Sequence, residues 1–167
     1  DLEWEVQQNL LFDHRLAPHA YVCVHPGARA PERRWSPEKF AAVADSLAEQ
    51  GFQIVLTGTE AEIPITLEVA GAMRHNCVNL AGKTSLGTLA ALLATSRLLI
   101  CNDTGVSHIA AGLKVPSIIL FLASDPQRWA PLNHWLHRPI AWAEATTPQI
   151  VLIEAEELLS EDVEYAA

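Results

Sequence analysis

The chain has 167 residues, a length that suits one ordinary domain and is too short for two. Half of its residues are hydrophobic and 19% are charged, which excludes an intrinsically disordered chain, and no apolar run reaches the roughly 18 residues that a membrane span needs. The net charge of −9 argues against a nucleic-acid-binding surface. Residues 1–138 carry only 11 − 13 = −2 of this charge, so this part of the chain is compatible with an anionic small ligand.

In chain order, the sequence alternates apolar runs with helical patterns. Short, continuously apolar runs predict strands at residues 21–24, 52–56, 77–80, 98–101 and 117–121. Helical patterns lie around them, at residues 1–12, 37–50, 60–73 (interrupted near Pro64), 85–95, 105–113 and 148–165. The helix over 37–50 has the clearest signals, with Ser36 as N-cap, Pro37 at the first helical position and Gly51 just past the end. Apolar strands separated by helices predict a parallel sheet covered on both faces, an α/β fold of the Rossmann-like class.

The cysteines and histidines give no sign of a metal site. Cys23, Cys77 and Cys101 lie in apolar, strand-like stretches and share no CxxC spacing, which predicts small buried side chains in a reducing compartment. His134 and His137 are three residues apart, but no second pair of ligands stands near them in the sequence. We therefore expect no metal.

Polar turns follow all five predicted strands. They lie at residues 25–29, 57–60, 81–85, 102–108 and 123–126. Ligands of open parallel α/β sheets bind beyond the carboxyl ends of the strands. We therefore expect these turns to lie along one edge of the sheet and to form the functional site.

The turn after the fourth strand has features of an anion-binding site. Asp103 or Thr104 is a suitable cap for the helix that follows, and Gly105 allows a ligand to approach the exposed amide groups closely. A helix N-terminus carries about half a positive charge and favours a phosphate. His108 falls in the first turn of this helix and would donate to the same anion. The alternative interpretation is an ordinary capped helix.

Charged residues near the other turns allow two interpretations each. Arg29, Arg33, Arg34 and Lys39 place four positive charges close to the end of the first strand, where they either bind phosphate or lie on a solvated surface. Glu60 follows a glycine turn. Its carboxylate either accepts hydrogen bonds from sugar or ribose hydroxyls or simply favours the dipole of the next helix.

Three short motifs point to functions that their context excludes. The triplet 103–105 spells Asp-Thr-Gly, but aspartic proteases need two such loops. The segment 82–84 resembles the end of a P-loop, yet Cys77 stands where that motif requires Gly. No G-x-G-x-x-G follows the first strand, so a standard dinucleotide-binding dehydrogenase is unsupported.

Five ordered segments between His25 and Pro131 carry a family resemblance: HPGA, RRWSPEKFAAVADSL, GFQIVLTGTEAE, NLAGKTSLGTLAALLATSRLLICNDTGVSHIAAGLKVPSIILF and SDPQRWAP. Together they resemble the C-terminal half of the family 9 glycosyltransferases, the ADP-heptose:lipopolysaccharide heptosyltransferases and their relatives. The block Asn102–Ala111, followed by a strand that begins after a proline, is the most specific part. One departure is Leu122, where the family usually has Gly.

The resemblance implies a GT-B architecture, in which two Rossmann-like domains face each other across a cleft and the C-terminal one binds a nucleotide-sugar donor. It implies sugar transfer with inversion and without a metal or cofactor. The general base is expected in an N-terminal acceptor domain outside this chain. We therefore expect no catalytic residue here, and we expect this chain alone to bind donor without turning it over.

The resemblance also implies which residues contact the donor. They are Gly27, Ala28, Arg33, Glu60, Thr84, Ser85, Asp103, Thr104, Gly105, Val106 and His108. The loop around Gly105 is expected to hold the diphosphate, with Arg33 on its other side, where the family commonly has Lys. Asp103 is expected to contact sugar hydroxyls, Glu60 the ribose or the sugar, and residues 84–85 to lie near the base.

On this interpretation the chain has three parts. Residues 1–19 are a connecting helix and linker, 20–147 the nucleotide-sugar-binding Rossmann-like domain, and 148–167 an acidic C-terminal helix. The expected partners are a nucleotide sugar and the N-terminal domain, with no nucleic acid. The expected location is the cytoplasm, or the inner face of the cytoplasmic membrane through the full-length enzyme.

Two other functions remain open. One is a non-catalytic module that binds nucleotide ligands or docks on a partner through its acidic terminal helix. The other is the donor domain of a different GT-B enzyme that uses a UDP-sugar, or of a sugar-nucleotide epimerase. The sequence leaves the sugar and the acceptor open, although ADP-heptose is the donor that the resemblance favours.

Overall fold

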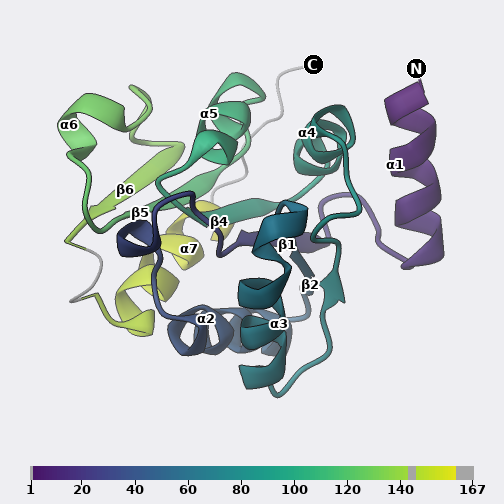
Figure 1. Cartoon of the computed structure of the whole chain (residues 1–167), viewed down its shortest axis with the longest axis horizontal. Coiled ribbons are helices and arrows are strands. Elements are labelled where there is room, and N and C mark those ends of the chain that lie inside the picture. Colours follow the sequence, from purple (N-terminus) through teal and green to yellow (C-terminus); the bar gives the residue numbers. More distant parts are fainter. Residues whose placement is uncertain (1, 143–145, 161–167) are drawn as a thin grey trace.

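The computed structural model describes residues 2–142 and 146–160, without the side chains of residues 2, 3 and 5–7 (Figure 1). A six-stranded sheet forms its centre, with the order β3-β2-β1-β4-β5-β6. The strands are β1 (Tyr21–His25), β2 (Gln53–Leu56), β3 (Val78–Asn79), β4 (Leu98–Asn102), β5 (Ser117–Phe121) and β6 (His137–Ala141). Every pairing between these strands is parallel, so the predicted α/β class is confirmed.

The helices cover both faces of the sheet. They are α1 (Leu2–Asp13), η1 (Pro31–Arg33), α2 (Pro37–Glu49), η2 (Glu60–Glu62), α3 (Ile63–Ala72), α4 (Leu86–Ala94), α5 (Gly105–Gly112), α6 (Pro126–Trp129) and α7 (Pro148–Ser160). One face packs against α2, α3 and α7, and the other against α1, α4 and α5 (Figure 1). Alternate residues of the strands point to the two faces, so Val22 and Val24 join the first core and Cys23 joins the second.

The expected local signals act as the sequence predicts. The Ser36 side chain accepts a hydrogen bond from the backbone N–H of Lys39, and Pro37 begins α2. The interruption near Pro64 is also present, because the 3₁₀ helix η2 leads into α3 and Pro64 lies in the first turn of the new helix. The predicted C-terminal helix is present as far as Ser160. Residues 161–165, which the prediction also included, lie outside the described residues.

The sequence analysis missed the sixth strand and the short helix before it. β6 pairs with β5 in parallel and forms one edge of the sheet. Pro139 lies inside it, which an edge strand tolerates because one side of the strand needs no partner for its N–H groups. The segment gave no strand signal because this proline and the half-buried pattern of its residues both argue against a buried strand.

The cysteines are free thiols, and two of them are fully buried as predicted. Burial raises the pKa of the Cys23 thiol to about 12 and also raises that of Cys101. Cys77 is only half-buried and lies just before β3. The buried thiols therefore act as small apolar side chains and stay protonated.

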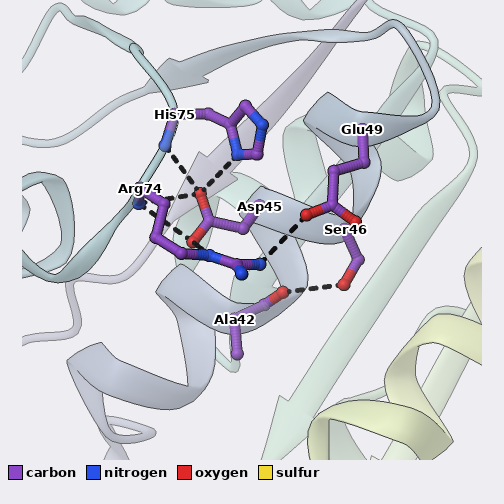
Figure 2. Close-up of polar contacts among 6 residues, drawn as sticks. All are labelled: Ala42, Asp45, Ser46, Glu49, Arg74 and His75. Carbon is purple, nitrogen blue, oxygen red and sulfur yellow. Dashed lines mark hydrogen bonds and ion pairs between the residues drawn. The ribbon is translucent and has the colours of Figure 1, made fainter.

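A polar cluster on α2 fixes the loop that leads into β3 (Figure 2). The Asp45 carboxylate is 3% exposed and accepts hydrogen bonds at 3.0 Å from the backbone N–H groups of Arg74 and His75. The His75 ring donates to it at 3.1 Å, and Arg74 also contacts Glu49 at 3.0 Å. Burial acts to raise the pKa of the Asp45 carboxyl, but these hydrogen bonds outweigh it and lower the pKa.

Among the described residues, no helix is both long enough and apolar enough to cross a membrane.

Candidate functional site

The polar turns after the strands lie along one edge of the sheet, as predicted, because parallel strands present their carboxyl ends on the same side. The chain order reverses between β1 and β4, which lie side by side. Ligands of such sheets bind in the crevice beyond the strand ends at this switch point. The turns after β1 and β4 are therefore the expected centre of a binding site.

Asn102, the last residue of β4, connects these two turns. Its side chain is fully buried. The Nδ2 donates to the carbonyl oxygen of Pro26 at 2.8 Å, and the Oδ1 accepts from the backbone N–H of Trp35 at 3.0 Å. Asn102 therefore holds the β1 turn against the start of α5. The sequence analysis gave it no role, although a buried asparagine that ends an apolar strand is a visible signal, because its amide needs partners.

The N-terminus of α5 has no side-chain cap. Thr104 occupies the N-cap position, but its side chain makes no capping hydrogen bond. The expectation that Asp103 or Thr104 caps this helix is therefore wrong. Gly105 is exposed, so the start of α5, with the positive end of the helix dipole, is open to a ligand.

Asp103 points away from the helix and toward two other turns. Its carboxylate is 5% exposed and accepts a hydrogen bond from the hydroxyl of Ser124, in the turn after β5. It also forms an ion pair with Arg33, whose Nη1 lies 3.7 Å from the Asp103 Oδ2. Asp103 is not available to cap α5 because Ser124 and Arg33 hold it, and it orients the Arg33 guanidinium in return.

Two cavities flank the start of α5. The first, which we call the polar cavity, has a volume of about 230 Å³ and is lined by Arg33, Asp103, Thr104, Gly105, His108 and Trp129. The second, the large cavity, has a volume of about 720 Å³. Residues 104–105 belong to both linings, so the two cavities meet at the uncapped end of α5.

The large cavity has two unlike walls. Its large apolar side chains come from α4 and α5: Leu86, Leu89, Val106 and Ile109. Most of its polar side chains come from β1 and from the segments after β1 and β2: His25, Arg29, Arg34, Thr59 and Glu62. A flat apolar group with a polar attachment fits such a cavity, because each wall then meets a matching surface.

Glu62, and not the predicted Glu60, is the carboxylate on this cavity. Glu60 is exposed and lines neither cavity. The Glu62 Oε2 accepts hydrogen bonds from the backbone N–H of Thr59 at 2.8 Å and from its hydroxyl at 3.0 Å. A Thr followed three residues later by Glu is the signature of a capping box, and this spacing could have identified Glu62.

Glu62 also links the turns after β1 and β2. Its Oε2 lies 3.6 Å from the Nε2 of His25, whose Nδ1 is 3.0 Å from the hydroxyl of Thr57. Burial lowers the pKa of His25, although the nearby carboxylate acts in the opposite direction. A Cβ added at Gly27 would lie 2.2 Å from the Glu62 carboxyl carbon, so Gly27 is the residue that makes room for this carboxylate.

The eleven predicted donor contacts fall into three groups, and the first two groups share residues 104–105. Those that line the polar cavity are Arg33, Asp103, Thr104, Gly105 and His108. Those that line the large cavity are Ala28, Thr104, Gly105 and Val106. Those that line neither are Gly27, Glu60, Thr84 and Ser85. Ser85 is the N-cap of α4, where its side chain accepts from the backbone N–H of Thr88 at 3.1 Å.

Positive charge gathers around the point where the cavities meet. Arg33 lies on the polar cavity, and Arg29 and Arg34 lie on the large one. Lys39 does not join them, since its Nζ donates to the carbonyl oxygen of Thr146. Together with the helix N-terminus, the arginines provide a site for a multivalent anion.

Among the side chains that the structure describes, no three His, Cys, Asp or Glu residues gather into a group that could hold a metal ion.

Comparison with known proteins gives a consistent family. The sequence model of glycosyltransferase family 9 (heptosyltransferase) matches residues 2–152. The lipooligosaccharide heptosyltransferase 2 of Haemophilus influenzae is 37% identical over 113 residues, which cover 65% of this chain and 33% of that protein. The lipopolysaccharide heptosyltransferase 3 of Escherichia coli is 34% identical over 166 residues, covering 87% of this chain and 48% of that protein.

A solved structure extends the likeness to the fold. The ADP-heptose lipopolysaccharide heptosyltransferase II of E. coli superposes with a TM-score of 0.82 and 30% sequence identity, covering 93% of this chain and 51% of that one. The chain therefore spans between about a third and a half of the length of these relatives. The Rossmann-like fold of a GT-B domain is confirmed, and the chain belongs to glycosyltransferase family 9, the heptosyltransferase family.

Proposed function

We propose that this chain is the donor-binding domain of an inverting glycosyltransferase that uses ADP-heptose in the synthesis of lipopolysaccharide or a related glycan. The observation that carries the proposal is the meeting of two unlike cavities at the uncapped N-terminus of α5. The site thus has three parts in order: the large cavity, the junction at the start of α5 and the polar cavity. A nucleotide sugar also has three parts in order: a base with its ribose, a diphosphate and a sugar.

The nucleoside is assigned to the large cavity. The apolar wall formed by Leu86, Leu89 and Ile109 offers a surface for the base. Glu62 lies on the opposite wall, where its carboxylate would accept hydrogen bonds from ribose hydroxyls. This contact replaces the one that the sequence analysis expected from Glu60.

The diphosphate is assigned to the junction of the two cavities. Its negative charge is stabilised there by the backbone N–H groups at the start of α5 and by the helix dipole. Arg33 would form charge-assisted hydrogen bonds with the same oxygens, and Asp103 keeps its guanidinium in position. His108, in the first turn of α5, would donate a further hydrogen bond.

The reaction that this arrangement serves is a displacement at the anomeric carbon. The acceptor hydroxyl loses its proton to a general base, its oxygen forms the new bond to the anomeric carbon, and the bond to the diphosphate breaks with both electrons leaving on the diphosphate oxygen. The share of this chain is to hold the donor in place and to stabilise the charge on the departing diphosphate. No metal is needed, because Arg33, His108 and the α5 N-terminus supply that stabilisation.

The general base and the acceptor site are assigned to an N-terminal domain outside this chain. The relatives are two to three times as long as the part of them that this chain matches, which supports such a domain. We further propose a cytoplasmic location, where a reducing environment would keep the three free cysteines as thiols.

Titration calorimetry with ADP, ADP-heptose and UDP tests this function. The 167-residue chain is expected to bind ADP and ADP-heptose with dissociation constants below about 1 mM, to bind UDP more weakly, and to transfer no sugar by itself. A preference for UDP would instead favour a UDP-sugar enzyme. No binding of any of the three nucleotides would contradict the assignment of the site.

A further inference from the structure

Trp129 is a large aromatic side chain on the wall of an otherwise polar cavity. The other side chains and backbone groups on that wall are polar, and they come from the turn after β4, from α5 and from Arg33. Trp129 keeps 45% of its surface exposed. Leaving so much aromatic surface in water forgoes the stabilisation that burial would provide, so a ligand that covers the ring would gain it instead.

The backbone that carries this ring is held by hydrogen bonds of the protein itself. The side chain of Asp125 caps α6 by accepting from the backbone N–H of Gln127 at 2.9 Å, and the N–H of Trp129 donates to the Asp125 carbonyl oxygen at 3.2 Å. Ser124, just before this helix, donates its hydroxyl proton to Asp103. α6 is therefore tethered to the turn that begins α5, and a ligand pays little ordering cost to contact Trp129.

Trp129 already has a cationic partner. The Arg128 guanidinium lies over the ring, 5.1 Å from its centroid. A cation over an aromatic face satisfies the negative quadrupole of that face. Because Arg128 already supplies a cation to the ring, the surface that the ring still exposes suits a neutral ligand group better than a second cation.

A sugar ring has the chemistry that this cavity would recognise. Its edge carries hydroxyl groups, and its faces carry weakly positive C–H groups, which are attracted to an aromatic face. The Asp103 carboxylate supplies an acceptor for the hydroxyl groups, and Trp129 supplies the aromatic face. A phosphate lacks an apolar face, and the base has its own apolar wall in the large cavity.

We propose that Trp129 is the platform on which the sugar of the nucleotide-sugar donor rests, so that it sets the affinity for the sugar part of the donor and leaves that for the nucleotide unchanged. This inference rests on the proposed function and adds a specificity-determining residue to it. The polar cavity is then the sugar subsite.

The test compares the affinities for ADP and for ADP-heptose in the whole 167-residue chain. In the wild-type chain, ADP-heptose is expected to bind more tightly than ADP. Trp129→Ala is expected to raise the dissociation constant of ADP-heptose by about three- to tenfold, the range that an aromatic contact provides, and to change that of ADP by less than about twofold. Trp129→Phe, which keeps an aromatic face, is expected to retain most of the sugar-dependent affinity.

Trp135 offers a matched control. It is 77% exposed and also has an arginine over its ring, with the Arg138 guanidinium 5.9 Å from the centroid, but it lines neither cavity. Trp135→Ala is expected to leave both dissociation constants unchanged. If Trp129→Ala unfolds too easily to be titrated, Trp129→Leu keeps the apolar bulk without the aromatic face, and it is expected to show the same selective loss.

The outcomes separate this inference from the proposed function. If Trp129→Ala weakens ADP and ADP-heptose equally, or weakens neither, Trp129 is not a sugar platform. If the wild-type chain binds both ligands with equal affinity, the sugar subsite is overturned while the nucleotide site stands. If the wild-type chain binds neither, the proposed function fails and this inference fails with it.

Discussion

Two buried aspartates, Asp45 and Asp103, are almost equally hidden from solvent but have different surroundings. Asp45 is 3% exposed and Asp103 is 5% exposed. The hydrogen bonds to Asp45 come from one short segment, from the backbone and side chains of Arg74 and His75 (Figure 2). Those donors surround its carboxylate on a loop that lies away from both cavities.

Asp103 has fewer partners, and they come from two separate turns. Ser124 donates from the turn after β5, and Arg33 approaches from the segment after β1. Arg33 keeps 44% of its side chain exposed, and both it and Asp103 line the polar cavity. Burial by itself therefore does not separate a structural carboxylate from one that serves a site. The difference lies in whether its partners are internal backbone donors or groups that also face a cavity.

The largest expected effect is on stability and comes from Asp45→Asn. The backbone N–H of Arg74 donates to both carboxylate oxygens, so in either orientation the new amide places a donor against it, and the free energy of unfolding is expected to fall by about 2 kcal/mol. Denaturant unfolding measures this change, and the dissociation constant of ADP should stay the same. Glu49→Gln is the control, because Glu49 contacts the same Arg74 from an exposed position and should cost less than about 0.5 kcal/mol.

The loss from Asp45→Asn would contradict this interpretation if it were no larger than that from Glu49→Gln. In that case the backbone donors of the loop would be satisfied by water in the variant, and Asp45 would not differ from a surface acid.

The second effect is on binding and comes from Asp103→Asn. The neutral side chain holds Arg33 less strongly and offers sugar hydroxyls a weaker acceptor. The dissociation constant of ADP-heptose is therefore expected to rise about tenfold, equivalent to about 1.4 kcal/mol, and the unfolding free energy to fall by less than in Asp45→Asn.

His108→Ala, which removes an exposed side chain, is expected to weaken ADP binding with little loss of stability. If both variants unfold the domain, the turn has a structural role only.

Sequence patterns were sufficient for five of the six strands and for the edge of the sheet on which the polar turns lie, because both follow from local regularities. Apolar runs located β1, β2, β3, β4 and β5, and the rule for parallel sheets placed the polar turns on one edge. The contacts within the site were harder to predict. Glu60 and Glu62 follow the same glycine turn. The capping-box spacing marks Glu62, but only the fold shows that Glu62 lines the large cavity while Glu60 is exposed.

Long-range partners explain the other differences. The position of Asp103 in the sequence suggested a cap for α5. Its carboxylate instead contacts Ser124 and Arg33, which come from distant segments of the chain. Trp129 gave no signal in the sequence, because its proposed role depends on the polar cavity, whose lining comes from segments that are distant in the chain. β6 gave no strand signal, because an edge strand does not need a continuous apolar run. It also does not need every residue to donate a backbone hydrogen bond, so Pro139 is tolerated there.

The smallest expected effect is the pH dependence that Asp45 contributes to stability. Its pKa is lower in the folded chain than the value of about 3.9 for an unperturbed aspartate, so the unfolded chain binds the proton more readily. The stabilisation is therefore fully present above the unfolded pKa and is lost as the pH falls through the folded one. Denaturant unfolding between pH 6 and pH 3 should show a steeper loss in the wild-type chain than in Asp45→Asn, which has no proton to bind at this position. Parallel curves for the two would mean that the hydrogen bonds from the Arg74–His75 loop stabilise the ionised form no more than the protonated form, which would contradict this account of Asp45.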